Sequence, residues 1–376
     1  MFTFDSTKLV TDELIGSGQY GWVYPYRKDP NDDRWVVKHL FAKNFDTFLV
    51  FMQEIVLGFN CDHPSLLPIK GYYVKGSLEN PGWNLYIKMP KMEKTLKHVM
   101  NQYLKTDTMI PEEEIVKYFY SMSCGLEYLH NRKIAHRDIK PTNILIDKQG
   151  NAKLADIGIA KFVPEDETSY LVNDIAGTPL YSAPETSNNP QLKKRDLYKA
   201  DAWSLGVVIA DLCLLKTRLI ESGRPLPNED RHLQIKEKLK GLEGKYSKVL
   251  VGLIENLLNC DIGERKTVND VKKSLEENYG EILGITKRKA EELPTFEESK
   301  IEMVAESMLI GSLAELPDKI GAELEDVKKT LENIEDKAVT MADLEIVKKE
   351  IHEKWRDIFE FKPNEYFSIR KVDSKR

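Results

Sequence analysis

Acidic, basic and amide side chains are concentrated in two short stretches of the chain. Residues 136–143 read HRDIKPTN, with a carboxylate at Asp138, a lysine two positions later and an amide five positions later. Residues 156–158 read DIG and add a second carboxylate just past a predicted turn. Phosphoryl transfer needs mainly correct positioning and neutralised charge. One proton acceptor and two metal ligands would meet that need if the fold brings them together.

A glycine-spaced turn near the N-terminus is a candidate phosphate cradle. Residues 15–23 read IGSGQYGWV, and the missing side chains at Gly16, Gly18 and Gly21 let backbone N–H groups approach phosphate oxygens. The same spacing suits a dinucleotide-binding fold when a helix follows. Here the residues from Trp22 to Tyr26 predict a strand. The pattern therefore speaks against a dinucleotide-binding fold.

A lysine at the end of an apolar run is the next candidate. Lys38 closes the stretch WVVK at 35–38, and burial of its ammonium costs free energy unless an anion pairs with it. Glu54, in the following helical pattern, is the natural partner. Taken alone, each residue also fits a solvated position, at a strand edge for Lys38 and on a helix surface for Glu54. Their spacing from the other motifs favours the pair.

Together these motifs resemble the protein kinase family, in order and spacing, from about residue 8 to residue 280. The resemblance implies catalytic roles for four residues. Asp138 would orient the substrate hydroxyl and accept its proton, and Lys140 would steady the γ-phosphate. Lys38 would bind the α- and β-phosphates and pair with Glu54. We therefore expect an ATP-dependent phosphotransferase that acts on a protein substrate.

The resemblance also implies the cofactors ATP and Mg²⁺, with Mn²⁺ as a possible substitute. Asn143 and Asp156 would hold two metal ions. Met89 would be the gatekeeper at the start of the hinge, and the adenine edge would meet backbone groups of Pro90 and Met92. The residues implied in ATP binding are Ile15, Gly16, Gly18, Gly21, Val23, Val36, Lys38, Met89, Pro90, Met92 and Leu145.

Four further residues are implied to be structural. Asp201, at the start of the stretch DAWSLG, would tie down the backbone of the catalytic loop that contains His136. Arg265 would pair with Glu185, in the stretch GTPLYSAPE that ends the activation segment. The stretch DAWSLG also contains Trp203, and the alternative for that residue is a plain core aromatic. The alternative for Glu185 and Arg265 is that both are solvated surface charges.

The type of hydroxyl acceptor follows from two dipeptides. Lys140-Pro141 and Thr178-Pro179 are the forms found in Ser/Thr-directed members, whereas tyrosine-directed members usually carry Ala and Arg in the first stretch. Ser/Thr specificity is favoured, and a dual-specific enzyme remains the alternative.

Regulation is expected to involve Arg137, whose charge commonly needs an activation-segment phosphate to offset it. Asp174 stands three positions before Gly177, where related kinases often carry the phosphorylated threonine. A permanent carboxylate there predicts basal activity without an upstream kinase. Alternatively, Asp174 is a solvated loop residue and a nearby hydroxyl is the switch. The other regulatory candidates are Thr168, Ser169, Tyr170 and Thr178.

Three positions depart from the family pattern. Ile157 replaces the usual Phe, and Gly58 stands four residues after Glu54, where a large aliphatic side chain normally packs. If nothing else fills the space, the active arrangement loses a few kcal/mol, about the cost of two side-chain contacts. Phe59 is expected to compensate by turning inward. Thr142 stands where many basophilic members have Glu, so a preference for upstream Arg or Lys is not expected.

The element pattern predicts an α+β fold of two lobes. Short β runs at 22–26, 34–40, 72–75 and 85–89, with a helix near 46–59, predict a small mostly-β N-lobe up to about residue 92. Helical patterns from 112 to 280, interrupted by a β-hairpin over 143–156, predict a larger mostly-α C-lobe from about residue 93. Residues 281–376 would form an appended α-helical unit.

Composition limits the other possibilities. The chain has 376 residues, is 41% hydrophobic and 31% charged, and carries a net charge of −6. It contains no apolar run near the ~20 residues of a membrane span, and its acidity argues against nucleic acid as a partner. Without signal-peptide features a cytoplasmic location is expected, with nuclear entry left open. The four cysteines are far apart, which favours reduced thiols.

The residues beyond about 286 are Lys/Glu-rich and predict three amphipathic helices. A faint helix-turn-helix resemblance at 312–321 is outweighed by acidic flanking residues and by a proline in a helical position. Docking on a protein partner or on the kinase lobes is favoured. A pseudokinase scaffold is a second reading of the whole chain, supported only by the thin apolar packing at Gly58 and Ile157. The apolar positions of the three helices are Ile301, Val304 and Met308; Leu324, Val327, Leu331 and Ile334; and Leu344, Val347, Ile351, Trp355 and Ile358.

Overall fold

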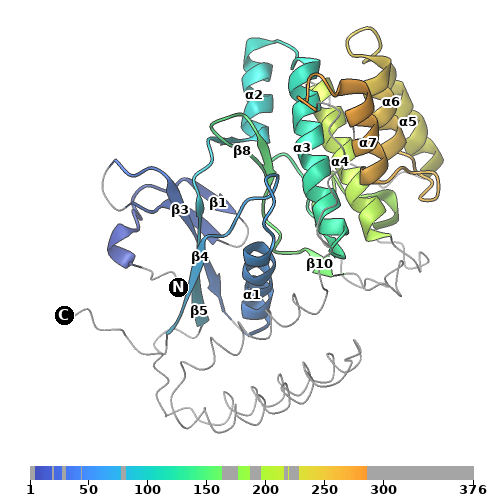
Figure 1. Cartoon of the computed structure of the whole chain (residues 1–376). Helices are drawn as coiled ribbons and strands as arrows, with labels where there is room; N and C mark the ends of the chain where they lie inside the picture. Colours follow the sequence, from blue (N-terminus) through green and yellow to red (C-terminus); the bar gives the residue numbers. More distant parts are fainter. Residues whose placement is uncertain are drawn as a thin grey trace.

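The computed structural model describes residues 5–18, 21–27, 31–43, 45–77, 82–162, 177–186, 196–215, 219 and 228–285. The predicted helical unit at 281–376 therefore lies outside the described residues from position 286 onward. Within the described part, the predicted two-lobed α+β fold is confirmed (Figure 1).

The N-lobe is a five-stranded antiparallel sheet with one long helix on one face. Its strand order is β1-β2-β3-β5-β4. All four predicted strands and the predicted helix are present, with bounds that differ by a few residues. The elements are β1 (Gly16–Gly18), β2 (Gly21–Pro25), β3 (Trp35–Ala42), α1 (Phe45–Asn60), β4 (Gly71–Ser77) and β5 (Gly82–Pro90).

The alternation of side chains in β3 explains how this lobe is held together. Val36, Leu40 and Ala42 are buried on the face that packs against α1. Lys38 shares this face because successive side chains of a strand point to opposite sides. The helix contributes Ile55, which is fully buried. Lys38 is thus carried by a buried strand, as the sequence predicted.

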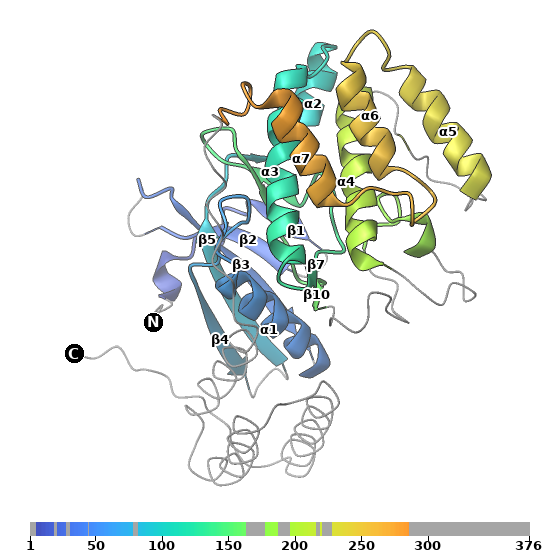
Figure 2. The same ribbon diagram turned by 45° about the vertical axis from the view of Figure 1, so that its right-hand side comes forward.

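The C-lobe is built from six helices of the described chain, and α4 lies at its centre (Figure 2). Positions 201–213 of α4 are all buried, which is expected of a helix surrounded by its neighbours. The helices α3, α6 and α7 pack around α4. The six helices are α2 (Leu96–Thr106), α3 (Glu112–His130), α4 (Leu197–Leu214), α5 (Asn228–Lys240), α6 (Lys248–Leu257) and α7 (Val268–Tyr279).

Two small antiparallel sheets in the C-lobe position the chemistry-bearing loops. The predicted hairpin is confirmed as β8 and β9, and Gly150 in its turn adopts a φ of 85°. Residues 136–143 connect β7 to β8, and residue 156 follows β9, so the sheets bring both motifs to one side of the lobe. The strands are β6 (Lys94–Thr95), β7 (Ile134–Ala135), β8 (Ile144–Ile146), β9 (Ala152–Leu154) and β10 (Lys161–Phe162).

Four of the six C-lobe helices start at side-chain caps, whereas α3 follows Pro111 and has no side-chain cap. Thr95, Asp196 and Ser247 accept hydrogen bonds from backbone N–H groups in the first turns of α2, α4 and α6. Thr267 and Asp270 form a reciprocal capping box at the start of α7. These caps explain why the helices begin where polar residues precede apolar runs.

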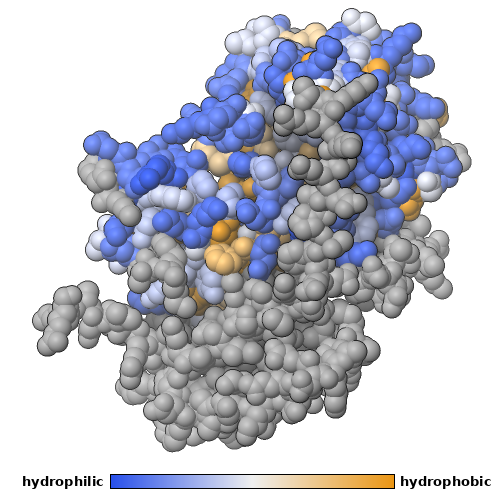
Figure 3. Space-filling view, viewed as in Figure 1, coloured by the Kyte–Doolittle hydropathy of each residue, from blue (hydrophilic) through white to orange (hydrophobic). Residues whose placement is uncertain are grey.

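Most of the surface of the described residues seen in Figure 3 is hydrophilic, and hydrophobic residues gather in a small area near the middle of this face. No helix in the described ranges is both long and apolar enough to span a bilayer. All four cysteines are free thiols.

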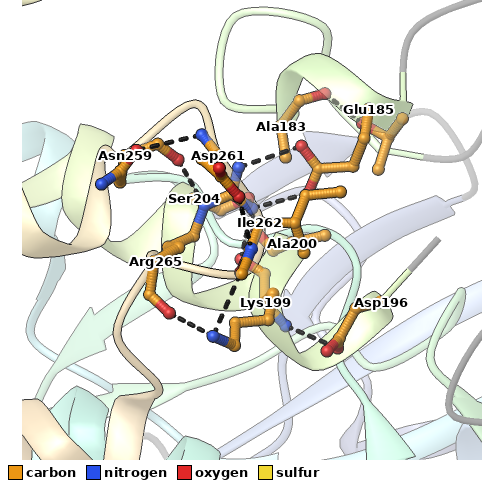
Figure 4. A network of polar contacts seen from close by, with 12 residues as sticks. Ala183, Glu185, Asp196, Lys199, Ala200, Ser204, Asn259, Asp261, Ile262 and Arg265 are labelled. Atoms are coloured by element: carbon orange, nitrogen blue, oxygen red, sulfur yellow. Dashed lines mark hydrogen bonds and ion pairs between the residues drawn. The ribbon is translucent and has the colours of Figure 1, made fainter.

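A buried ion pair fastens the end of the activation segment to the helical core (Figure 4). Arg265 is 1% exposed, and its two terminal nitrogens donate to the carboxylate of Glu185 at 2.6 and 3.0 Å. The same guanidinium donates to the backbone carbonyls of Asn259 and Lys199. Its carbon lies 4.9 Å from the centre of the Trp203 ring. The predicted Glu185–Arg265 pair is confirmed, and the solvated-charge alternative is wrong.

Replacing Arg265 by Lys should destabilise the protein although the charge is kept. Lysine is a single point donor and cannot reproduce a planar fork that makes four hydrogen bonds at once. We expect a loss of about 3 kcal/mol in unfolding free energy, the scale of breaking a buried pair. Urea denaturation measures it, with Lys266→Arg as the matched control. Unfolding curves that coincide with the parent would show that the fork is dispensable.

Candidate active site

The carboxylate of Asp138 lies at the centre of a compact hydrogen-bond network in the C-lobe. Lys140 Nζ is 2.5 Å from its Oδ2, and the side-chain amide of Asn143 donates to the same oxygen at 2.8 Å. The Thr178 hydroxyl donates to Oδ1 at 2.8 Å and accepts from Lys140 at 3.0 Å. Asp138 itself is 8% exposed. Residues 136–143 and the segment after Gly177 therefore meet at one carboxylate.

The orientation of Asn143 leaves its amide oxygen available as a ligand. Its Nδ2 donates both to the Asp138 carboxylate and to the Asp138 backbone carbonyl, at 2.8 and 3.0 Å. The oxygen must then point away from Asp138, because nitrogen and oxygen occupy opposite branches of the amide. Amide and carboxylate oxygens are the donors that Mg²⁺ prefers. Asn143 thus fits the predicted metal-binding role.

The backbone of the catalytic loop is held by Asp201, at the start of the buried run of α4. Its carboxylate accepts from the N–H groups of His136 and Arg137 at 2.7 and 2.8 Å and from His130 Nε2 at 2.9 Å. Burial opposes ionisation of Asp201, but the His130 and backbone hydrogen bonds outweigh it and lower the pKa of this carboxyl. The predicted anchoring of the loop by Asp201 is confirmed.

Two loop residues adopt a left-handed backbone beside this anchor. Arg137 has a φ of 69° and Asp156 a φ of 62°, a region that non-glycine residues rarely occupy. Arg137 is held by its N–H bond to Asp201 and by a side-chain bond to the carbonyl of Ile159. Such strain persists where surrounding contacts fix the chain, as they do in functional sites.

Lys38 joins three separate elements of the fold. Its ammonium lies 2.6 Å from Glu54 Oε1 in α1 and 3.0 Å from Asp156 Oδ1 after β9. Burial opposes the charge on Lys38, yet the two carboxylates outweigh it and raise the pKa of the lysine. Burial, helped by the nearby Asp156, raises the pKa of Glu54, whereas Lys38 lowers that of Asp156. The predicted pairing of Lys38 with Glu54 is confirmed, and both solvated alternatives are wrong.

The glycine motif is divided between two paired strands. Gly16 lies opposite Val23, and Gly18 lies opposite Gly21. A Cβ atom on Gly21 would lie only 2.1 Å from the carbonyl oxygen of His39, so no other residue fits there. Around Gly16 a Cβ would meet nothing within 4 Å. Residues 19 and 20, at the tip of the motif, lie outside the described residues.

The predicted hinge follows the last strand of the N-lobe. Met89 and Pro90 end β5, and the backbone N–H of Lys91 already donates to the carbonyl of Arg34 at 2.8 Å. Proline has no N–H, so Pro90 can offer only its carbonyl oxygen. Met92 is then the next residue that can offer an N–H group. Val36 is buried, whereas Ile15 is 48% exposed at the mouth of the predicted site.

The space that Gly58 leaves is filled by an unexpected residue. A Cβ atom at position 58 would lie 2.5 Å from Ile69 Cδ1 and 3.5 Å from Ile157 Cδ1. Ile157 is buried, but Phe59 is 44% exposed and its ring lies edge-on to Tyr72. The expectation that Phe59 turns inward is therefore wrong. Ile69, between α1 and β4, replaces the missing volume.

This packing predicts that Gly58→Leu is harmful and that Ile69→Ala rescues it. The added side chain must displace Ile69, and overpacking costs about 1–3 kcal/mol, more than the ~1 kcal/mol gained by removing a helical glycine. We expect a net loss of about 1 kcal/mol for Gly58→Leu. The double variant Gly58→Leu/Ile69→Ala should recover more than half of it.

Chemical denaturation of the parent, both single variants and the double variant measures this coupling. Ile69→Ala alone should also destabilise, because it opens a cavity beside Gly58. If the two substitutions were simply additive, Ile69 would not occupy the space that Gly58 leaves.

Two residues of the site were not assigned to it from the sequence. Thr178 was expected to mark Ser/Thr specificity and to act in regulation, and Ile69 was not singled out. The Thr178-Pro179 dipeptide gave no sign that the hydroxyl reaches Asp138, because that contact spans 40 positions. The regulatory candidates Thr168, Ser169, Tyr170 and Asp174 lie outside the described residues.

Comparison with known proteins agrees with this geometry. The family model described as "Protein kinase domain" matches residues 9–275. The chain is 30% identical over 266 residues to serine/threonine-protein kinase dst2 of Dictyostelium discoideum, covering 69% of this chain and 22% of that protein. It is 29% identical over 268 residues to mouse serine/threonine-protein kinase Nek5, covering 69% of this chain and 39% of the relative.

The match to the family model covers well over half of the chain, so the protein belongs to the protein kinase family. A plant relative, probable serine/threonine-protein kinase PBL18 of Arabidopsis thaliana, is 30% identical over 240 residues and is covered to 57% of its length. The chain thus spans between about a fifth and three fifths of the length of these relatives.

Proposed function

We propose that the protein is an ATP-dependent kinase that transfers the γ-phosphoryl group of Mg·ATP to Ser or Thr hydroxyls of protein substrates. The observation that carries the proposal is the Asp138 network. One buried carboxylate is held by a lysine and an amide of its own loop and by a threonine hydroxyl from a segment 40 positions away. These hydrogen bonds fix the orientation of the carboxylate, as is required of a proton acceptor that must face the hydroxyl of the substrate.

The chemistry at this point is an in-line displacement. The acceptor oxygen forms a bond to the γ-phosphorus, the bond from that phosphorus to the bridging oxygen breaks, and ADP leaves with the electron pair. Asp138 receives the hydroxyl proton as the new bond forms. Lys140, 2.5 Å from Asp138, would also offset the charge on the transferred group with its ammonium.

The residues present fit a divalent metal ion with ATP. Asp156 supplies a carboxylate whose side chain is 37% exposed, and Asn143 supplies an amide oxygen directed away from Asp138. Both are hard oxygen donors, which favours Mg²⁺, and Mn²⁺ would suit the same set. A bound ion would offset the negative charge of the phosphates. Lys38 would bind the α- and β-phosphates while Glu54 keeps it oriented.

Adenine would be recognised by the hinge backbone. The Pro90 carbonyl can accept from the exocyclic amine, and the Met92 N–H can donate to a ring nitrogen. The apolar walls would come from the N-lobe strands and from Leu145 in β8. This arrangement reads the base without any charged side chain.

Ser/Thr rather than Tyr acceptors are favoured by the contacts of Thr178. Its hydroxyl lies within the catalytic network and bonds Asp138 and Lys140, and Lys140 begins the Lys140-Pro141 dipeptide that is typical of Ser/Thr-directed members. Three similar proteins also carry the name serine/threonine-protein kinase. The pseudokinase alternative loses its support, because Ile69 fills the packing gap on which it depended.

Two further expectations belong to this proposal. Arg137 would take its counter-charge from Asp174, giving basal activity without an upstream kinase, with Thr168, Ser169 and Tyr170 as secondary sites. The enzyme would act in the cytoplasm on a protein substrate. The role of Asp174 can be tested by comparing the phosphatase-treated parent with the variant Asp174→Ala. The parent should keep its kinase activity after phosphatase treatment, whereas the variant should lose activity.

Asp138→Asn should lower kcat by about 10²–10⁴-fold, the usual contribution of a general base. ATP affinity should stay nearly unchanged, because the carboxylate acts on the acceptor hydroxyl. A radiolabelled-ATP assay on a generic protein substrate measures turnover, and nucleotide titration measures affinity. Asp147→Asn, the same change in the exposed hairpin turn, is the matched control. A fully active Asp138→Asn enzyme would show that Asp138 is not the proton acceptor.

Asp156→Ala should remove most of the thermal stabilisation that Mg·ATP gives the parent. The variant lacks a metal ligand, and Lys38 loses one of its two carboxylate partners. Thermal-shift titration with Mg·ATP, with and without EDTA, tests this. The exposed Asp62→Ala is the control and should behave like the parent. Equal stabilisation of parent and Asp156→Ala would exclude the metal role.

A further inference from the structure

The face of the N-lobe sheet that points away from α1 carries a row of aromatic rings. Trp22, His39, Tyr86 and Tyr73 lie directly opposite one another on β2, β3, β5 and β4. Their ring centroids are 5.8, 4.6 and 6.1 Å apart, and the His39 and Tyr86 rings are stacked at 6°. We call these residues, with the positions in register on the same side, the outer face.

The outer face is open and cationic. Trp22 is 42% exposed and Tyr73 is 37% exposed. Lys75 and Lys88 lie on the same side as Tyr73 and Tyr86, because they are two positions along each strand. None of the residues in β2–β5 is Asp or Glu. An aromatic surface with basic edges favours an apolar partner that carries negative charge.

The chain itself contains a segment of that chemistry. Residues 291–336 carry fourteen acidic and four basic side chains. Within them, Leu324, Val327, Leu331 and Ile334 form an apolar stripe at helical spacing. Glu323 and Glu335 fall on either side of this stripe, about 60° from its centre on a helix of 3.6 residues per turn. This segment lies outside the described residues.

We propose that the segment 323–335 docks as a helix on the outer face of its own N-lobe. The apolar stripe covers the aromatic row, and Glu323 and Glu335 approach Lys75 and Lys88. An isolated helix of this length is marginal in water, so its apolar stripe needs a partner surface. A sheet with α1 on one side and a second helix on the other gives a three-layer arrangement that is common in proteins.

The covalent connection allows this arrangement. The 38 residues between Ile285 and Leu324 reach about 125 Å when fully extended, far more than the diameter of a lobe. Tethering also raises the effective concentration of the segment, so weak contacts suffice. The other long stripe is a poorer fit, because residues 341–360 carry six acidic and four basic side chains and are closer to neutral.

Photo-crosslinking from the outer face tests the proposal in the full chain. Benzoylphenylalanine replaces Tyr73, which is remote from the residues placed in the active site, and the crosslinked peptides are identified by mass spectrometry. We expect an intramolecular crosslink to peptides containing 323–335. The stripe variant Val327→Glu/Leu331→Glu should lower its yield about tenfold or more, as expected from loss of two buried side chains.

Benzoylphenylalanine at Met109, an exposed apolar position of the C-lobe, is the control and should not reach the segment. Thermal unfolding and kinase activity of the Tyr73 derivative confirm that it is folded. A crosslink to residues 344–358, a crosslinked dimer, or a yield unchanged in the stripe variant would each overturn the proposal. So would the absence of any crosslink in the active, folded derivative.

Discussion

The ion pair of Lys38 with two carboxylates is the interaction on which the arrangement of the two lobes depends. A lysine on a buried strand cannot stay charged unless anions surround it, because transfer of an ammonium from water is costly. Here the anions come from α1 and from the segment after β9. The requirement to neutralise one cation therefore ties the sheet, the helix and the C-lobe together at the place where phosphates must bind.

The same constraint organises the C-lobe. Asp201 is 1% exposed, and three donors from the region around the catalytic loop satisfy it. Arg265 is equally buried and holds Glu185. Each charge would be destabilising alone, and each is compensated by groups distant in sequence. Because removing one partner leaves the other unpaired, the two clusters hold the catalytic loop and the described end of the activation segment, 177–186, in one geometry each.

The sequence predicted the fold and the ionic contacts because these depend on residue types at fixed spacing. Residue types and spacing alone indicated three features of the site: a lysine on an apolar run, a glutamate in the next helix, and the Asp-Lys-Asn spacing. Packing was less predictable. The roles of Ile69 and Phe59 depend on which side chain fills a gap of a few ångströms, and both isoleucine and phenylalanine are apolar enough to do so. The direction in which each side chain leaves its backbone determines which of the two fills the gap. No local sequence pattern specifies that direction.

The packing beside Gly58 also shows how a third residue, Ile69, can compensate for two departures from the family pattern. A phenylalanine at position 157 would extend further than Ile157, whose Cδ1 already lies 3.5 Å from the site of a Cβ on residue 58. Ile69 approaches the same point to 2.5 Å, so the space is shared by two branched aliphatic side chains. Branched side chains have few rotamers, and they lose less entropy on ordering than a long flexible residue would. The contact between the lobes thus keeps its volume while its shape changes, and the charged residues around Lys38 need not move.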